Sequence, residues 1–169
     1  MGALALDAGA FEDIERDRRA DMQSVLVVLS VSAAAGLAAI GLGLAGPAGF
    51  VAGAIVMLGA WVLWVAAIAA IGTVTLAEPQ TRSDVHELLR VLGYAAAPGL
   101  FLALAVMRAA APIVLAIVAV WMIAAAVLAV RQALDYRSTV RAAAVCVIAW
   151  LLSFGVFAAA ALFFSQPVS

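Results

Sequence analysis

The most reactive side chains in this sequence are a single histidine, His86, close to Asp84 and Glu87, and a single cysteine, Cys146. A histidine beside carboxylates can act as a general base or bind a metal ion. A metal site needs several converging ligands, however, so one imidazole on a charged helical segment is more often a solvated side chain. Cys146 lies in an apolar stretch that disfavours a thiolate, so we expect it to pack as a small apolar side chain.

The composition is that of an integral membrane protein. Of the 169 residues, 68% are hydrophobic and only 11% are charged, and the mean hydropathy is +1.21. In soluble domains about a quarter of the residues are charged. Every basic residue is arginine and alanine is abundant, which is typical of a GC-rich bacterial genome. We therefore expect a multi-pass protein of the bacterial cytoplasmic (inner) membrane.

Apart from Arg108, the ionisable side chains are confined to residues 1–21, 78–90 and 131–141 and to Cys146 and the tyrosines. The apolar stretches contain no Asp, Glu, Lys or His. Intramembrane hydrolysis, disulfide exchange and proton-coupled transport need titratable groups or a cysteine pair within the spans. We therefore expect no catalytic, metal-binding or cofactor-binding residue. An enzyme would have to use interface residues such as His86.

The lengths of the apolar stretches predict an all-α fold with five transmembrane helices in one domain. A single helix over 22–77 would reach about 84 Å at ~1.5 Å per residue, far beyond a hydrocarbon core of roughly 30 Å. We expect Gly46-Pro47 to break it. Gly49 and Gly53 follow with GxxxG spacing, which permits close helix contact. The predicted spans are about 22–44, 48–75, 91–107, 112–130 and 140–164.

A short amphipathic helix is predicted over residues 83–92, at the membrane interface. Ser83 is well placed as its N-cap, and apolar side chains recur at the i, i+3, i+4 and i+7 positions of one face. We expect the opposite face, with Asp84, Glu87 and Arg90, to be solvated. Such a mixed-charge surface suits either solubility or a protein partner.

The third span is the shortest of the predicted crossings. Its uncharged part, 91–107, has 17 residues, which is the lower limit for a membrane-spanning helix. Pro98 within it removes a backbone hydrogen bond, so we predict a kink there. A re-entrant segment that returns to the same side is the alternative.

The arginine positions predict the orientation in the membrane. Residues 1–21, 78–90 and 131–141 hold eight of the nine basic residues, and Arg108 is the ninth. Because positively charged loops stay in the cytoplasm, five crossings place the N-terminus inside and the tail 165–169 outside. A re-entrant third segment would move 131–141 outside, so the arginine distribution favours five crossings. For the first segment, a cleaved signal peptide is the alternative, although no cleavage region follows the long apolar run.

Three segments occur in a characteristic order: FEDIERDRRA before the first span, SDVHELLRVLGYAAAP at 83–98 and VRQALDYRSTVRAA at 130–143. Their order resembles that of the Ypt/Rab-interacting Yip-one domain family, in particular its bacterial branch, over residues 11–164. Gly93, Tyr94 and Pro98 match the family's motif. The resemblance implies five spans, a cytoplasmic N-terminus and a membrane-embedded interaction or organising role. Eukaryotic relatives bind small GTPases, but this chain lacks their Asp-Leu-Tyr-Gly-Pro motif and long cytoplasmic tail. GTPase binding is therefore not expected.

We expect a non-catalytic membrane protein that acts as an interaction, scaffold or membrane-organising component. Its partners would be the lipid bilayer and either a second copy or another membrane protein, and not a nucleic acid. The uncharged spans and the many small residues favour such helix packing. The alternative is a passive channel or carrier for a small neutral or lipidic molecule. The polar residues available to line its path are Ser30, Ser32, Thr73, Thr75, Tyr94 and Ser153.

Overall fold

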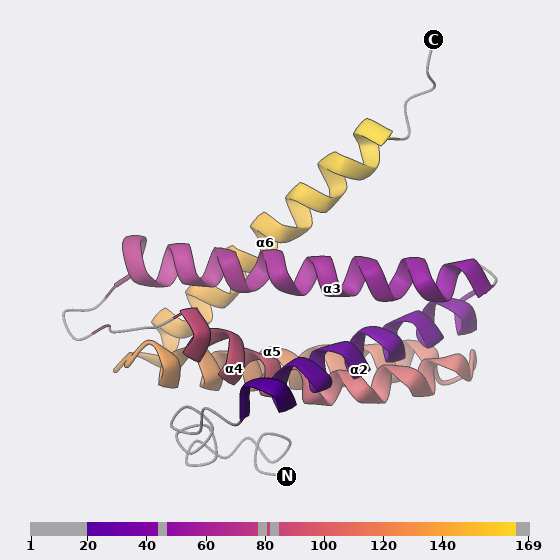
Figure 1. Cartoon of the computed structure of the whole chain (residues 1–169), viewed down its shortest axis with the longest axis horizontal. Helices are drawn as coiled ribbons and strands as arrows, with labels where there is room; N and C mark the ends of the chain where they lie inside the picture. The colour runs from indigo at the N-terminus through magenta and orange to yellow at the C-terminus, as the bar shows by residue number, and fades with distance from the viewer. Residues whose placement is uncertain (1–19, 44–46, 78–80, 82–84, 165–169) are drawn as a thin grey trace.

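The computed structural model describes residues 20–43, 47–77, 81 and 85–164, and long helices dominate it (Figure 1). Among them, α3 is continued by a π-helical segment, η1, and α4 is followed by a 3-10 helix, η2. In chain order the elements are α2 (Ala20–Gly41), α3 (Pro47–Ala70), η1 (Ile71–Thr75), α4 (Val85–Ala95), η2 (Ala97–Val106), α5 (Ala111–Ala133) and α6 (Thr139–Phe164).

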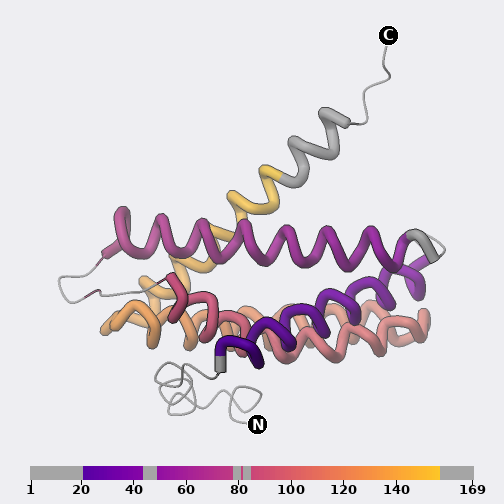
Figure 2. Tube along the Cα trace, viewed as in Figure 1, coloured from indigo at the N-terminus to yellow at the C-terminus, as the bar shows by residue number. Residues whose placement is uncertain are grey.

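Several predictions concern residues that lie outside this description, which Figure 2 draws in grey. They are the charged segment before the first span, the break at Gly46, the N-cap Ser83 and the tail 165–169.

Five segments of the described residues are long and apolar enough to cross a membrane, which confirms the prediction of an all-α polytopic protein. The third begins earlier than predicted because α4 and η2 together form one apolar segment. The five are Asp21–Gly41, Gly49–Thr75, Val85–Val106, Ala111–Ala133 and Thr139–Val156.

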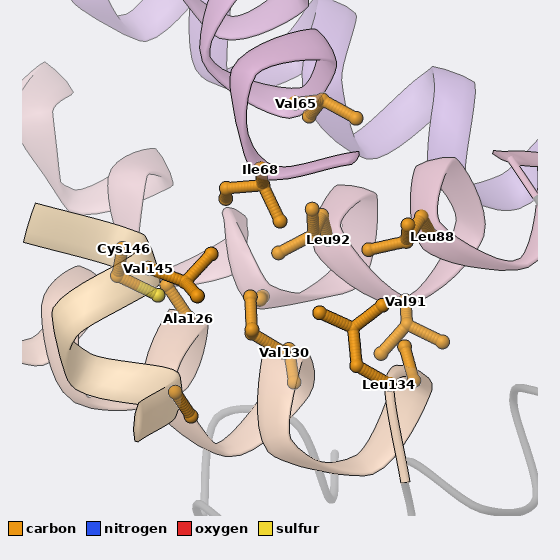
Figure 3. Close-up of a cluster of buried hydrophobic side chains, with 14 of the residues drawn as sticks. Val65, Ile68, Leu88, Val91, Leu92, Ala126, Val130, Leu134, Val145 and Cys146 are labelled. Carbon is orange, nitrogen blue, oxygen red and sulfur yellow. The ribbon is translucent and has the colours of Figure 1, made fainter. Parts of the chain in front are cut away.

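The main hydrophobic core lies where α3, α4, α5 and α6 converge (Figure 3). The apolar face of α4, predicted from its spacing, fills the middle of this core with Leu88 and Leu92, which are fully buried. Ile68 of α3 and Val130 of α5 contact the same cluster. Lipid tails are as apolar as these side chains, so the helices associate through close van der Waals packing rather than exclusion of water.

The third span runs parallel to α2 along its length. Glycines mark the contact because they let the two backbones approach closely. A Cβ placed on Gly93 would lie 2.8 Å from Ser24 Cβ, one on Gly99 would lie 2.6 Å from Val31 Cγ1, and one on Gly41 would lie 2.5 Å from Ala105 O. The segment therefore passes from the start of α2 to its end, as a crossing helix must.

The 3-10 geometry of η2 lengthens the uncharged part of the third span. A 3-10 helix rises about 2.0 Å per residue, against about 1.5 Å for an α-helix. Residues 91–96 at the α-helical rise and the ten residues of η2 at the 3-10 rise together reach about 29 Å. This matches a hydrocarbon core of roughly 30 Å, whereas an α-helix over 91–107 would reach only about 26 Å.

Candidate functional site at the Arg-rich end

Four of the described arginines, Arg90, Arg131, Arg137 and Arg141, lie toward one end of the bundle, which we call the Arg-rich end. Arg90 of α4 donates from Nε to Oδ1 of Asp21, the first acidic residue of α2, across 2.5 Å. Arg90 is only 6% exposed. The prediction that it belongs to a solvated face was therefore wrong. Its position depends on Asp21, which lies 69 residues away in sequence.

The two family-motif residues next to Arg90 also contact the start of α2. Gly93 packs against Ser24, as described above, and the Tyr94 hydroxyl donates to Gln23 Oε1 across 2.5 Å. Ser24 in turn donates its hydroxyl to Asp21 O at 2.8 Å. The motif therefore fixes the register between α4 and α2.

Pro98, the third family-motif residue, is buried and lies at the start of η2. It has no backbone N–H to donate to Tyr94 O, so the α-helical pattern cannot continue through it. Gly99 N instead donates to Ala96 O at 2.8 Å, a 3-10 bond. The predicted disturbance at Pro98 thus takes the form of a change in helix type.

The turn after α5 directs Tyr136 into the core. Asp135 has φ 53°, and the N–H groups of Asp135 and Tyr136 donate to Gln132 O and Arg131 O at 3.0 and 2.9 Å. These bonds form a Schellman motif, in which the second residue after the helix packs back onto it. Tyr136 is consequently buried, and its hydroxyl donates to Gly72 O of η1 at 2.7 Å.

The start of α6 is tied to the end of the second span. Arg141 N donates to Ser138 Oγ at 3.3 Å, so Ser138 is the N-cap of α6. The Arg141 guanidinium donates from Nη1 to Leu76 O and Ala77 O at 3.4 and 3.3 Å. It therefore satisfies backbone carbonyls where the α3–η1 helix ends.

Sequence reasoning did not identify the contacts that Tyr136, Arg141 and the buried Arg90 make. A signal for Tyr136 was present, because an aromatic residue directly after an Asp at a helix end fits the apolar position of a Schellman motif. The pairing of Arg90 with Asp21 had no local signal. The Arg90–Asp21 and Tyr136–Gly72 contacts both join segments that are distant in sequence.

The remaining predicted residues lie away from this end. Gly53 packs on α2, where its Cβ would lie 3.3 Å from Gly36 Cα, and Gly49 is buried. The structure therefore brings together Gly93, Tyr94 and Pro98 on one segment, with Gly49 and Gly53 elsewhere. Cys146 is buried in the main core, as predicted for a packing residue.

The contacts described above at the Arg-rich end are hydrogen bonds and the ion pair of Arg90 with Asp21. Within the described ranges, no three His, Cys, Asp or Glu side chains are grouped in a way that could hold a metal ion. His86 is exposed on α4. Most of these polar contacts join one helix to another, close a turn or cap a helix. These contacts join α4 to the start of α2, and they join the α5–α6 turn and the start of α6 to the end of the α3–η1 helix.

Comparison with known proteins agrees with the resemblance read from the sequence. The family model described as the Yip1 domain matches residues 3–160. Neither curated proteins nor solved structures gave a match. Members of this family are generally non-catalytic membrane proteins. With five candidate spans and a match over most of its length, this chain belongs to the Yip1 domain family of multi-pass helical membrane proteins.

Proposed function

We propose that this protein is a non-catalytic component of the bacterial cytoplasmic membrane that associates with itself or with another membrane protein. The observation that carries the proposal is an apolar flank formed by α3 and α6. In the second candidate span, Gly49–Thr75, only 11% of an 18-residue apolar stretch is buried within the chain. The corresponding share in the third candidate span, Val85–Val106, is 50%. Much of α3 is therefore available to neighbours in the membrane.

The α3–α6 flank carries large aromatic side chains. Trp150 and Phe154 stack with ring centroids 5.7 Å apart, and both are exposed. With Trp64 of α3 they line a groove of about 250 Å³. Aromatic residues are enriched in protein interfaces because they supply large contact areas at small entropic cost.

The direction of α6 leaves part of this flank open. The first half of α6 packs on α3, where the Trp64 indole N–H donates to Cys146 O at 3.4 Å. Further along, α6 crosses α3 and leaves the bundle (Figure 1). A Cβ on Gly155 would meet nothing within 4 Å. This half of α6 can therefore contact a second protein without rearrangement of the bundle.

The channel alternative receives less support from the hydroxyl groups that were expected to line a path. Ser30, Ser32, Thr73 and Ser153 each donate to the carbonyl four residues earlier in their own helix, at 2.6–2.9 Å. Hydroxyls that are satisfied in this way offer few sites to a passing polar molecule.

The experiment is to size the purified protein in a mild detergent by light scattering. We expect a mass above that of one chain, or a membrane protein that co-purifies in fixed ratio. Trp150→Ala with Phe154→Ala should reduce the particle to one chain. The matched control is Ile113→Ala with Ile117→Ala, because these are exposed apolar residues of α5. A wild-type protein that is strictly monomeric and co-purifies with nothing would contradict the proposal.

A further inference from the structure

The helices α2 and α3 form a wedge, with its closed end near the turn between them. There, a Cβ on Gly36 would lie 2.5 Å from Phe50 O, so the two backbones are in direct contact. Toward the Arg-rich end the two helices are further apart (Figure 1). We call the space between them at that end the α2–α3 wedge.

The α2–α3 wedge contains a groove of about 300 Å³. Ser24 at its rim already donates its hydroxyl to Asp21 O. The other side chains that line it are apolar or aromatic and come from three helices: Val25, Val28 and Leu29 of α2, Leu58 and Trp61 of α3, and Leu89 of α4. A ligand in this groove would be held on three sides rather than against one flat face.

The depth of the groove corresponds to one leaflet of the bilayer. Its lining on α2 extends from Ser24 to Leu29, and Leu29 lies about 12 Å beyond Asp21 at the α-helical rise. Half of a hydrocarbon core is roughly 15 Å. The groove therefore begins just below the polar contacts of Asp21 and Gln23 and ends near the middle of the bilayer.

The shape of the groove excludes a neighbouring helix as its occupant. A helix with side chains is about 10 Å wide and would have to continue along the wedge. The contact of Gly36 with Phe50 closes the wedge before the far side of the bilayer. A flexible chain that enters from one leaflet and stops near the midplane fits this geometry.

We propose that the α2–α3 wedge binds one acyl chain of a membrane phospholipid from the leaflet at the Arg-rich end. The lipid headgroup would then lie beside Gln23 and Asp21, which is 53% exposed. A lipid bound in this way would exchange more slowly than the other lipids that surround the protein. The site is on a different flank from the α3–α6 surface, so its failure and that of the proposed function are distinguishable.

The test reconstitutes the full chain into vesicles of palmitoyl-oleoyl phosphatidylglycerol and phosphatidylethanolamine, and releases it for native mass spectrometry. We expect one phospholipid to remain on the wild-type protein after the others are stripped. Val25→Trp fills the groove and should abolish that retention. Leu26→Trp is the matched control, since Leu26 is equally exposed but does not line the groove. Equal retention by both variants, or no retained lipid on the wild-type protein, would overturn the proposal.

A second measurement on the unaltered chain covers the case in which Val25→Trp does not fold. A phospholipid with a diazirine in the middle of one acyl chain is photocrosslinked in the same vesicles, and the labelled peptides are mapped. Preferential labelling of Val25, Leu29 and Leu58 is expected. Labelling that is no stronger there than at exposed α5 residues such as Ile117 overturns the site. A Val25→Trp variant that changes the number of chains per particle, with lipid retention unaltered, also overturns it.

Discussion

Arg90 Nε and Asp21 Oδ1 lie 2.5 Å apart, yet 7% of the Arg90 side chain is exposed against 53% of the Asp21 side chain. A buried guanidinium must keep an acceptor, because an unpaired buried charge is strongly unfavourable. The exposed Asp21 carboxylate, in contrast, can be hydrated by water even when Arg90 is absent. Asp21 also lies in the first turn of α2, where a negative charge interacts favourably with the helix dipole. Loss of the Asp21 carboxylate should therefore cost more than its own exposure suggests, because it leaves the buried Arg90 charge without this partner.

Replacement of Asp21 by Asn should weaken this connection. We expect Asp21→Asn to lower the free energy of unfolding by about 1.5–3 kcal/mol, the range for hydrogen bonds to charged groups. Unfolding in a mild detergent, followed by tryptophan fluorescence, measures this change. Arg137→Gln serves as the control, because Arg137 is exposed at the same end, and should change stability by less than about 0.5 kcal/mol. Equal losses in both variants would show that the pair has no special role.

The two tyrosine hydroxyls at the Arg-rich end should differ in their contribution to stability. Tyr136 is buried and donates to Gly72 O, whereas the bond from Tyr94 to Gln23 is exposed. We expect Tyr136→Phe to cost about 1–2 kcal/mol because a buried carbonyl loses its donor. Tyr94→Phe should cost less than about 0.5 kcal/mol. Hydrogen exchange at residues 71–76 should accelerate in Tyr136→Phe alone, and protection that stays unchanged would argue against the Tyr136 bond.

The number of spans could be predicted because it depends on local properties. Apolar length and charge locate helices in a bilayer, and a Ser before a helix predicts an N-cap. These rules correctly gave the number of candidate spans, which is five. Each of these rules considers one helix at a time. None of them indicates which other helices pack around that helix.

The burial of Arg90 could not be predicted for that reason. A single apolar face indicates a helix with one buried side, but α4 contacts the core through Leu88 and Leu92 and contacts α2 through Arg90 and Gly93. Burial on two sides is a property of the assembled bundle. The 3-10 geometry of η2 could not be predicted either. Pro98 predicts that a backbone hydrogen bond is lost, but it does not predict which helix type follows.

Two glycine substitutions should differ in their effect on stability. A Cβ on Gly41 would lie 2.5 Å from Ala105 O, a backbone atom that cannot move without a shift of η2. We expect Gly41→Ala to destabilise the fold by about 1–3 kcal/mol. Gly155 has open space around it, so Gly155→Ala should be neutral or stabilise the helix by up to about 1 kcal/mol. Thermal unfolding of the two variants side by side measures the contrast. A loss of stability in both variants would indicate that α6 packs against another molecule around Gly155.

Full crossing by the third span predicts a specific labelling pattern. The combined reach of residues 91–106 is about 29 Å, and a Cβ on Gly43, at the far end of α2, would lie 2.7 Å from Arg108 Nη2. In a Cys146→Ala background, Arg108→Cys should react with a membrane-impermeant maleimide in intact bacterial spheroplasts. Thr81→Cys and Arg137→Cys should react only after permeabilisation.

The three positions distinguish the possible topologies because each one predicts a different pattern. If the third segment returned to the cytoplasmic side, Arg137→Cys would be labelled from outside and Arg108→Cys and Thr81→Cys would not. If the whole chain were inverted, Thr81→Cys and Arg137→Cys would both be labelled from outside. External labelling at Arg108→Cys alone is expected only when α4 and η2 cross the bilayer as one segment and the Arg-rich end faces the cytoplasm.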